Sequence, residues 1–190
     1  KFELSSEYRE LIAIVMKKYP EIGIEIMTDD VIYLPSRNDI VEHHMAKEDL
    51  ENVDCTIDDM PKKSAIKILF GVPTKQIEDF LNEINAFLNL ELFYSVRTDE
   101  NYCEIMPSGV NKGSGLERLK GINNDCWDCV IAFGDFFNDL PLFEKANFSI
   151  DTTNAPVEVK RCADFVVSSN DCDAIAEGID LFLKKGILIK

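Results

Sequence analysis

The sequence predicts an α/β fold, in which a parallel sheet with flanking helices follows a unit of α+β type. Helical and strand patterns alternate from residue 112 onward, which is typical of parallel strands joined by right-handed crossovers. Residues 130–133 are apolar without alternation, as in a strand that is buried on both faces. The chain has 190 residues, of which 46% are hydrophobic, so it can bury a core for one large domain or two small ones.

Residues 1–106 predict the α+β unit. A helix over residues 6–19 has its apolar side chains on one face, and Pro20 ends it. The polar segments 28–30 and 99–101 each separate two short apolar segments, which is the signal of a β-hairpin. Residues 36–59 are polar and only weakly periodic. The remaining predicted elements are strands at 22–27, 31–34, 65–70, 92–96 and 102–106 and a helix at 77–88.

Residues 107–190 predict the parallel-sheet unit. Only three strands are visible in it, and nothing left in the chain is an obvious neighbour for the apolar strand at 130–133. We expect that residues absent from this sequence complete the sheet, or that a second copy of the chain pairs with that edge. The predicted elements are helices at 112–120, 140–146, after Pro156 and at about 173–184, with strands at 130–133, 148–150 and 165–167.

Polar side chains gather where the strand at 130–133 ends. Asp135 follows that strand, so a carboxylate reaches the edge where open parallel sheets bind ligands. Asn138 and Asp139 come next, as predicted caps of the helix at 140–146. Three polar side chains in one turn between a strand and a helix suit a hard cation and a phosphate.

The histidines and cysteines do not form a recognisable metal or redox motif. His43 and His44 are adjacent, so their side chains would diverge on a helix, and a solvated face is expected. The six cysteines are scattered, and this composition does not predict a disulfide framework. Cys126 and Cys129 have the spacing of redox and zinc sites, but no second pair of ligands lies at a matching distance.

The charge of the chain disfavours two classes of partner. Thirty-five acidic and twenty basic residues give a formal charge of -15, which nucleic acid and anionic membranes would both repel. No apolar run approaches the roughly 20 residues of a membrane span, and no leader precedes the first helix, so we expect a cytoplasmic protein. The sequence begins with Lys1 and Phe2 rather than Met, and we expect a processed or truncated piece of a longer protein.

Four groups of residues form spaced motifs. They are Glu104-Ile105-Met106-Pro107-Ser108-Gly109-Val110-Asn111-Lys112-Gly113, Gly134-Asp135 with Asn138-Asp139, Asn154-Ala155, and Ala163-Asp164 before Val166-Val167 and Ser169-Asn170. These motifs resemble those of the haloacid dehalogenase-like (HAD) phosphatases of the Cof type. The similarity runs from about residue 92 to residue 178 and keeps the spacing of that family. It implies a Rossmann-like parallel-sheet core, and the element order of residues 1–106 is that of the α+β cap domain inserted into this core.

The resemblance implies phosphomonoester hydrolysis through an aspartyl-phosphate. One aspartate attacks phosphorus, and a second protonates the leaving oxygen and then activates water. Lys112 would neutralise the nucleophile and the transferred phosphoryl group. Asp135 would be a direct ligand of Mg²⁺, and Asp139 would support the metal directly or indirectly. Asn138 would orient the loop or contact phosphate, and Asn154 would close the rim of the site.

The nucleophile motif of that family, Asp-x-Asp at the end of an apolar strand, is missing. Asp171-Cys172-Asp173 has the spacing, but it stands where the family has its last loop and helix. Asp29 and Asp30 are adjacent, so their carboxylates would point to opposite sides of a strand. The Ser or Thr that holds phosphate in the second motif is also missing, and Phe136 replaces a small residue after the metal aspartate.

Two interpretations of different class follow. In the first, the chain is the cap and the C-terminal part of the core of a Mg²⁺-dependent phosphatase acting on small phosphorylated metabolites, such as sugar phosphates or a nucleotide-like cofactor, and by itself it lacks the nucleophile. In the second, it is a catalytically inactive binding or interaction module. Candidate substrate contacts in the cap are Arg37, His43, His44 and Arg97.

Overall fold

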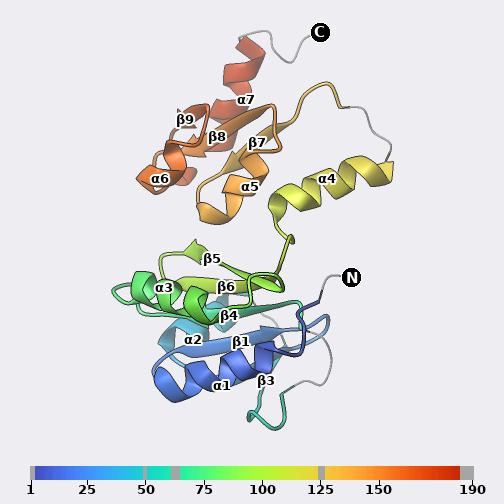
Figure 1. The fold of residues 1–190 in the computed structure, drawn as a ribbon. Helices are drawn as coiled ribbons and strands as arrows, with labels where there is room; N and C mark the ends of the chain where they lie inside the picture. Colours follow the sequence, from blue (N-terminus) through green and yellow to red (C-terminus); the bar gives the residue numbers. More distant parts are fainter. Residues whose placement is uncertain (1–2, 49–50, 61–64, 124–126, 185–190) are drawn as a thin grey trace. The chain divides into compact units, whose positions relative to one another are not determined.

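The computed structural model describes residues 3–48, 51–60, 65–123 and 127–184 (Figure 1). The chain divides into two compact units, the first ending at Val110 and the second beginning at Asn111. The sequence predicted a boundary at residue 106. Among the helices of the described part, none is both long enough and apolar enough to cross a membrane.

The first unit is built on a six-stranded mixed sheet with the strand order β3-β2-β1-β4-β6-β5. Both predicted hairpins are present as antiparallel pairs, with Ile26 opposite Tyr33 and Val96 opposite Glu104. The elements of this unit are α1 (Tyr8–Lys18), β1 (Gly23–Met27), β2 (Ile32–Ser36), α2 (Asp39–Glu48), β3 (Asn52–Asp54), β4 (Lys67–Gly71), α3 (Ile77–Phe87), β5 (Phe93–Asp99) and β6 (Tyr102–Pro107).

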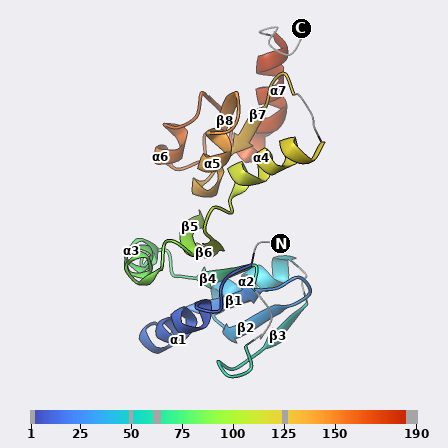
Figure 2. The same cartoon turned by 45° about the vertical axis from the view of Figure 1, so that its right-hand side comes forward.

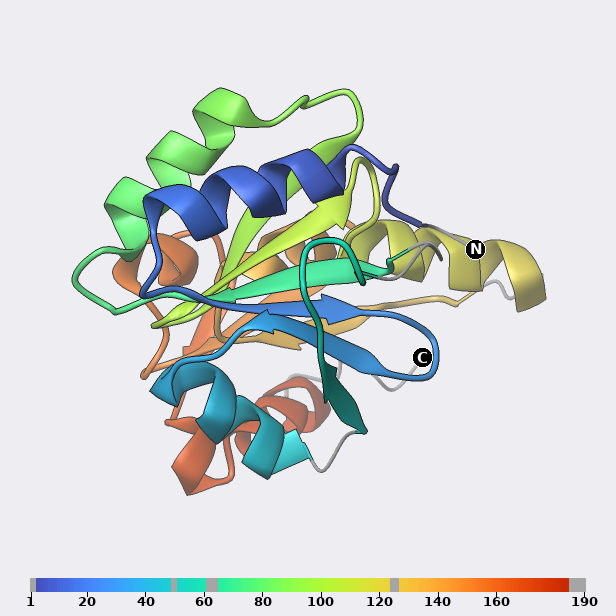
Figure 3. The same cartoon turned by 90° about the horizontal axis from the view of Figure 1, so that it is seen from below.

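Helices cover this sheet unequally, with α1 and α3 on one face and α2 on the other (Figure 3). The main core lies under α1 and α3, because the alternation of β1 directs Ile24 and Ile26 to that face. Phe80 of α3 is its centre, with ring centroids 5.4 Å from Tyr19 and 5.3 Å from Phe70. The apolar residues whose spacing predicted these two helices are therefore the residues that the helices contribute to this core.

Helix α2 and strand β3 lie in the region for which the sequence predicted no elements. Val41 and Met45 of α2 pack against Ile32 and Leu34 of β2 in a small separate core. Only these two large apolar side chains of the helix are buried there, so its sequence pattern is weak. Tertiary contact, rather than amphipathic periodicity, identifies α2.

The second unit contains a three-stranded parallel sheet with the order β7-β8-β9. This confirms the predicted α/β class with parallel strands. The predicted helix at 140–146 begins at the expected residue but is shorter than expected, because it ends at Phe143 in a turn. The elements are α4 (Lys112–Asn123), β7 (Ile131–Gly134), η1 (Phe137–Asp139), α5 (Leu140–Phe143), β8 (Phe148–Thr152), α6 (Val157–Lys160), β9 (Phe165–Val167), η2 (Asn170–Cys172) and α7 (Ala174–Lys184).

Both faces of the parallel sheet carry helices, with α7 on one side and α5 and α6 on the other (Figure 2). Phe182 of α7 is fully buried, with ring centroids 5.0 Å from Phe148 and 5.6 Å from Phe165. Gly178 brings α7 close to β7, because a Cβ atom at this position would lie 2.4 Å from the Phe133 ring. Apolar packing therefore fixes α7 against all three strands.

Strand β7 lies at the edge of the sheet formed by the described residues, and of its side chains only Ala132 is buried. The prediction that this strand is buried on both faces is therefore wrong for the chain as it stands. Next to the open edge, α7 exposes three large apolar side chains at helical spacing. They are Ile175, Ile179 and Leu183, which are 53%, 43% and 46% exposed. The prediction that a further strand pairs with β7 stays a prediction.

Candidate active site

The turn after β7 is built around the buried carboxylate of Asp139, which is 3% exposed. Its Oδ2 atom accepts hydrogen bonds from the backbone N–H groups of Asp135 at 3.0 Å and Phe136 at 3.3 Å. Gly134 is required here, because a Cβ atom would lie 2.5 Å from the Asp139 Cβ. The prediction that Asn138 and Asp139 cap α5 holds for the position of Asp139, which is the N-cap residue, but the Asp139 side chain makes no capping hydrogen bond to that helix. Asp139 instead folds back and shapes the turn that presents Asp135.

Lys112 reaches this turn from the first turn of α4. Its Nζ atom forms an ion pair with Asp139 Oδ1 across 27 residues of sequence. The N-terminus of α4 is fixed by reciprocal hydrogen bonds between Asn111 and Ser114, at 2.8 and 3.0 Å. Gly113 lets α4 approach α5, because a Cβ atom there would lie 2.1 Å from the Pro141 carbonyl oxygen. The sequence around Lys112 thus holds its ammonium group at the C-terminal end of β7.

Three of the five predicted site residues line one cavity of about 650 Å³, namely Lys112, Asp135 and Asp139. The Asp135 carboxylate is partly exposed and makes no hydrogen bond with the part of the chain that the structure describes. Asn138 does not line the cavity. Asn154 is exposed, and its Oδ1 atom accepts a hydrogen bond from the Asn170 backbone N–H at 3.0 Å. The structure therefore assigns Asn154 to the support of a neighbouring loop.

The remainder of the cavity wall was not predicted from the sequence. Asn170 and Asp173 contribute polar groups from the segment between β9 and α7. Asp173 has a φ of 55°, a left-handed conformation that Asp tolerates better than most residues. Asp173 lies in the segment that was rejected as a nucleophile motif, and Asn170 directly precedes that segment. The presence of η2 followed by α7 agrees with the loop and helix expected there. The apolar wall is formed by Phe133, Ala174, Ile175, Ala176 and Ile179.

Two consecutive polar residues at the end of β8, Asp151 and Thr152, are also buried. Asp151 Oδ1 accepts a hydrogen bond from the Thr152 backbone N–H at 2.9 Å. Asp151 Oδ2 and Thr152 Oγ1 have no partner among the described residues. Burial raises the pKa of Asp151, and the nearby carboxylates of Asp135 and Asp139 raise it further. The sequence held a signal for Asp151, because this carboxylate follows an apolar strand just as Asp135 does.

The donor set of this site fits Mg²⁺ better than a soft metal. Mg²⁺ takes one or two carboxylates, several waters and phosphate oxygens, and Asp135 offers a carboxylate beside a cavity that can hold the rest. Both oxygens of Asp139 are engaged, which favours an indirect role for that residue. Within the described ranges, no three His, Cys, Asp or Glu side chains converge to hold a metal by themselves. Cys126 lies outside the described residues, and Cys129, the second cysteine of the C-x-x-C spacing, forms no disulfide with a described cysteine.

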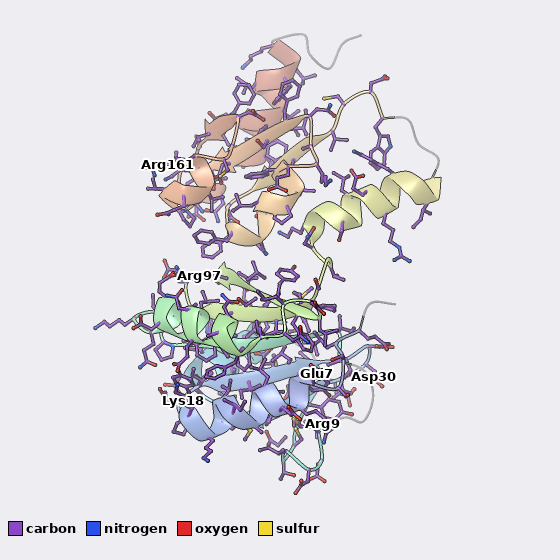
Figure 4. All side chains as sticks on the ribbon, in the orientation of Figure 1. Glu7, Arg9, Lys18, Asp30, Arg97 and Arg161 are labelled. Atoms are coloured by element: carbon purple, nitrogen blue, oxygen red, sulfur yellow. The ribbon has the colours of Figure 1, made fainter. Side chains whose placement is uncertain are left out.

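The two arginines among the candidate substrate contacts, Arg37 and Arg97, are engaged in interactions within the first unit. Arg37 pairs with Asp54 at 2.5 Å and Glu42 at 2.8 Å. Arg97 of β5 donates to Glu78 of α3 at 2.7 Å (Figure 4).

The expectation of a solvated histidine face holds for His43 but is wrong for His44. His44 is mostly buried, and its Nδ1 atom lies 2.9 Å from each carboxylate oxygen of the fully buried Glu25. The two side chains therefore form a satisfied pair in the interior of the unit.

Comparison with known proteins shows the family to which the chain belongs. The model of the haloacid dehalogenase-like hydrolases matches residues 3–179. The chain is 27% identical over 180 residues to a Haemophilus influenzae protein, covering 92% of this chain but 66% of that one. It is 38% identical over 120 residues to a phosphoglycolate phosphatase of Methanothermobacter thermautotrophicus, covering 63% of this chain and 51% of the relative. The chain thus spans less than two thirds of the length of either relative.

Solved structures share the fold of the whole chain. A Streptococcus mutans protein superposes with a TM-score of 0.84 at 22% identity, covering 97% of this chain and 70% of that one. The HAD subclass IIB sugar phosphatase BT4131 superposes with a TM-score of 0.80 at 17% identity, covering 96% of this chain and 68% of that one. At these identities the likeness concerns the fold alone.

Proposed function

Because the chain belongs to the haloacid dehalogenase-like hydrolase family, we propose that it forms part of a Mg²⁺-dependent phosphatase that hydrolyses phosphomonoesters of small metabolites, such as sugar phosphates. The observation that carries this proposal is the convergence of Lys112 and Asp139 beside Asp135, at the C-terminal ends of parallel strands. An ammonium group, a metal-binding carboxylate and a cavity are three of the parts that phosphoryl transfer uses, besides a nucleophile.

Each of these residues has a distinct role in the proposed reaction. The Lys112 ammonium neutralises negative charge on the transferred phosphoryl group, and Asp139 holds that ammonium in place. Asp135 is the direct ligand of Mg²⁺, which when bound neutralises charge on the phosphate oxygens. Asp139 also fixes the backbone of Asp135, so the position of the metal-binding carboxylate depends on it.

The nucleophile belongs, in this proposal, to a segment outside the present sequence. An apolar strand that pairs with the open edge of β7 would bring its C-terminal end next to Lys112 and Asp135. The exposed edge and the apolar side chains of Phe133, Ile175 and Ile179 beside it support this arrangement. The carboxylate on that strand attacks phosphorus as the ester oxygen leaves with a proton, and water then cleaves the acyl-phosphate to release phosphate.

The first unit acts in this proposal as the cap that selects the substrate. Support comes from the names of two relatives, a phosphoglycolate phosphatase and a Bacillus subtilis 5-amino-6-(5-phospho-D-ribitylamino)uracil phosphatase that is 39% identical over 84 residues. Both names describe small phosphorylated metabolites that differ in the group attached to phosphate. In this proposal the relatives share a phosphate site, and a cap that differs between them selects the group attached to phosphate.

The test is a phosphatase assay on the protein expressed from the complete reading frame, with a panel of phosphate esters. We expect hydrolysis that requires Mg²⁺, is lost on chelation, and is abolished by Asp135→Ala. The control is Asp180→Ala, which removes a carboxylate from the exposed face of α7, where it pairs with Lys184. Activity that survives Asp135→Ala would contradict the metal assignment. A folded protein that binds phosphate esters but hydrolyses none would favour the alternative of an inactive binding module.

A further inference from the structure

We propose that Asp151 is a positioning residue for the divalent cation and that its buried Oδ2 atom accepts a hydrogen bond from a water bound to that cation. The inference rests on the proposed function, because it takes the cation and its direct ligand, Asp135, from there. It adds a carboxylate from the neighbouring strand that acts through water rather than by direct coordination. Outer carboxylates of this kind orient the inner ligands and tune the affinity of a metal site.

The backbone places Asp151 on the same side of the sheet as Asp139. Side chains alternate along β8, and Ile150 packs in the core on the α7 side, so Asp151 faces the opposite side. Its register partner on β7 is Gly134, over which the Asp139 side chain lies. Because Gly134 has no side chain, β7 inserts nothing between these two carboxylates. The electrostatic influence of Asp135 and Asp139 on Asp151 agrees with this proximity.

The Oδ2 atom of Asp151 is a buried acceptor to which no described residue donates. Asp151 is 0% exposed, and of its two carboxylate oxygens only Oδ1 has a partner within the described segments. Leaving a buried polar group unpaired costs about 1–3 kcal/mol. Ser149, two residues earlier on the same face, shows the satisfied alternative, because its hydroxyl and its amide both donate to Asp164, at 2.9 and 2.8 Å. The polar groups of Ser149 are thus paired within the fold, whereas Asp151 Oδ2 accepts no hydrogen bond from a described residue.

A cation-bound water is the donor that this environment favours. Three carboxylates, Asp135, Asp139 and Asp151, share this region with two ammonium groups, those of Lys112 and Lys160, so the local charge is negative and attracts a cation. The three carboxylates do not converge to coordinate a metal directly. Mg²⁺ usually keeps several of its waters in protein sites, and each of these waters donates hydrogen bonds to acceptors around it. A carboxylate that contacts the cation through one water does not coordinate the metal directly, and it accepts a hydrogen bond from that water.

The experiment measures binding of Mn²⁺, as a probe for Mg²⁺, to the 190-residue chain by electron paramagnetic resonance, with Mg²⁺ as a competitor. The variant is Asp151→Asn, which keeps the shape and removes the charge, and Asp135→Asn reports the direct ligand. Asp180→Asn is the matched control, since it removes one exposed carboxylate from the same unit. Water-proton relaxation of the bound Mn²⁺ reports the hydration of the ion. Near-UV circular dichroism checks the fold, and Asp151→Ser replaces Asp151→Asn if that variant does not fold.

We expect Asp135→Asn to remove Mn²⁺ binding, Asp151→Asn to weaken it about tenfold, and Asp180→Asn to leave it unchanged. The relaxation enhancement should also change in the Asp151 variant, because a held water becomes free to exchange. Unchanged binding in a folded Asp151 variant would overturn this inference and leave the proposed function intact. Unchanged binding in Asp135→Asn, or an unmodified chain that binds no Mn²⁺, would overturn the metal assignment and the inference with it.

Discussion

The two units of this chain differ in how completely their buried polar groups are paired by hydrogen bonds or ion pairs. Helices cover both faces of the sheet in each unit. In the first unit the buried or partly buried charges are paired, as with Glu25 and His44 or Lys67 and Glu104 at 2.7 Å. In the second unit two consecutive buried polar residues, Asp151 and Thr152, each have an oxygen without a partner among the described residues. The described part of the first unit has one such atom, Thr98 Oγ1. The unsatisfied groups of the second unit border the region that binds the proposed metal and phosphate.

Two amphipathic helices show the same difference. Helix α3 in the first unit turns one apolar face inward and buries it in a single core. Helix α7 in the second unit buries Phe182 on one face and exposes Ile175, Ile179 and Leu183 on an adjacent one. A helix with apolar residues on two faces is suited to two neighbours. The comparison therefore indicates which surface of the chain a further strand would cover.

The largest expected effect concerns Lys112, which connects α4 to the turn after β7. In the protein from the complete reading frame, Lys112→Ala should lower kcat by about 10²- to 10³-fold, as removal of one group that stabilises transition-state charge does. Steady-state kinetics measure this loss. Lys120→Ala is the control, because Lys120 lies on the same helix and pairs locally with Glu117. Equal kinetics for the two variants would contradict the role of Lys112.

The central aromatic residues test whether the two units are energetically separate. Phe182→Ala and Phe80→Ala each remove a fully or almost fully buried ring, and each should lower the free energy of unfolding by about 3–5 kcal/mol. Since each ring packs within its own unit, each variant should shift the unfolding transition of that unit only. Urea titration followed by hydrogen exchange measures both transitions. Phe87→Ala, at an exposed position of α3, should change little, and a single common shift would contradict separate units.

Ile179 tests the incomplete surface of α7. In the present chain Ile179→Ser should change the free energy of unfolding by no more than about 0.5 kcal/mol, because the side chain is 43% exposed. In the protein from the complete reading frame the same change should cost about 1–2 kcal/mol, because a further strand would bury it. Denaturant titration of both proteins gives the comparison. Equal small effects in both would indicate that no additional segment covers α7.

Much of the fold could be predicted because its elements carry local signals. The helices α1, α3 and α7 and the two hairpins follow from apolar periodicity and turn residues, and the parallel sheet follows from the alternation of elements. Helix α2 could not be predicted, because only Val41 and Met45 of its apolar side chains are buried. The edge position of β7 could not be predicted either, since the sequence pattern of an apolar strand is the same whether the neighbouring strand belongs to this chain or lies outside it.

The candidate site was predicted where a local pattern identified it and missed where the fold creates it. Lys112, Asp135 and Asp139 belong to spaced motifs, and the structure brings them to one cavity. The role of Asp139 in the turn depends on Gly134 and on backbone N–H groups, which a motif does not describe. Asn170 reaches the cavity because η2 follows β9, which lies in the same parallel sheet as β7, so its place depends on the order of strands in the sheet.

The smallest expected effect concerns Tyr94, which forms a hydrogen bond to Val110, the last residue of the first unit. Its hydroxyl donates to the Val110 carbonyl oxygen at 2.6 Å, so Tyr94→Phe should lower the free energy of unfolding of that unit by about 1 kcal/mol at neutral pH. Burial raises the pKa of Tyr94 from 10.0 to about 12, which favours the neutral phenol in the folded state. The contribution of this phenol to stability is complete below pH 10 and is lost as the pH rises toward 12. The difference between wild type and Tyr94→Phe should therefore shrink over this interval, as measured by denaturant titration at increasing pH. A difference that stays constant would mean that the folded state does not hold this phenol neutral.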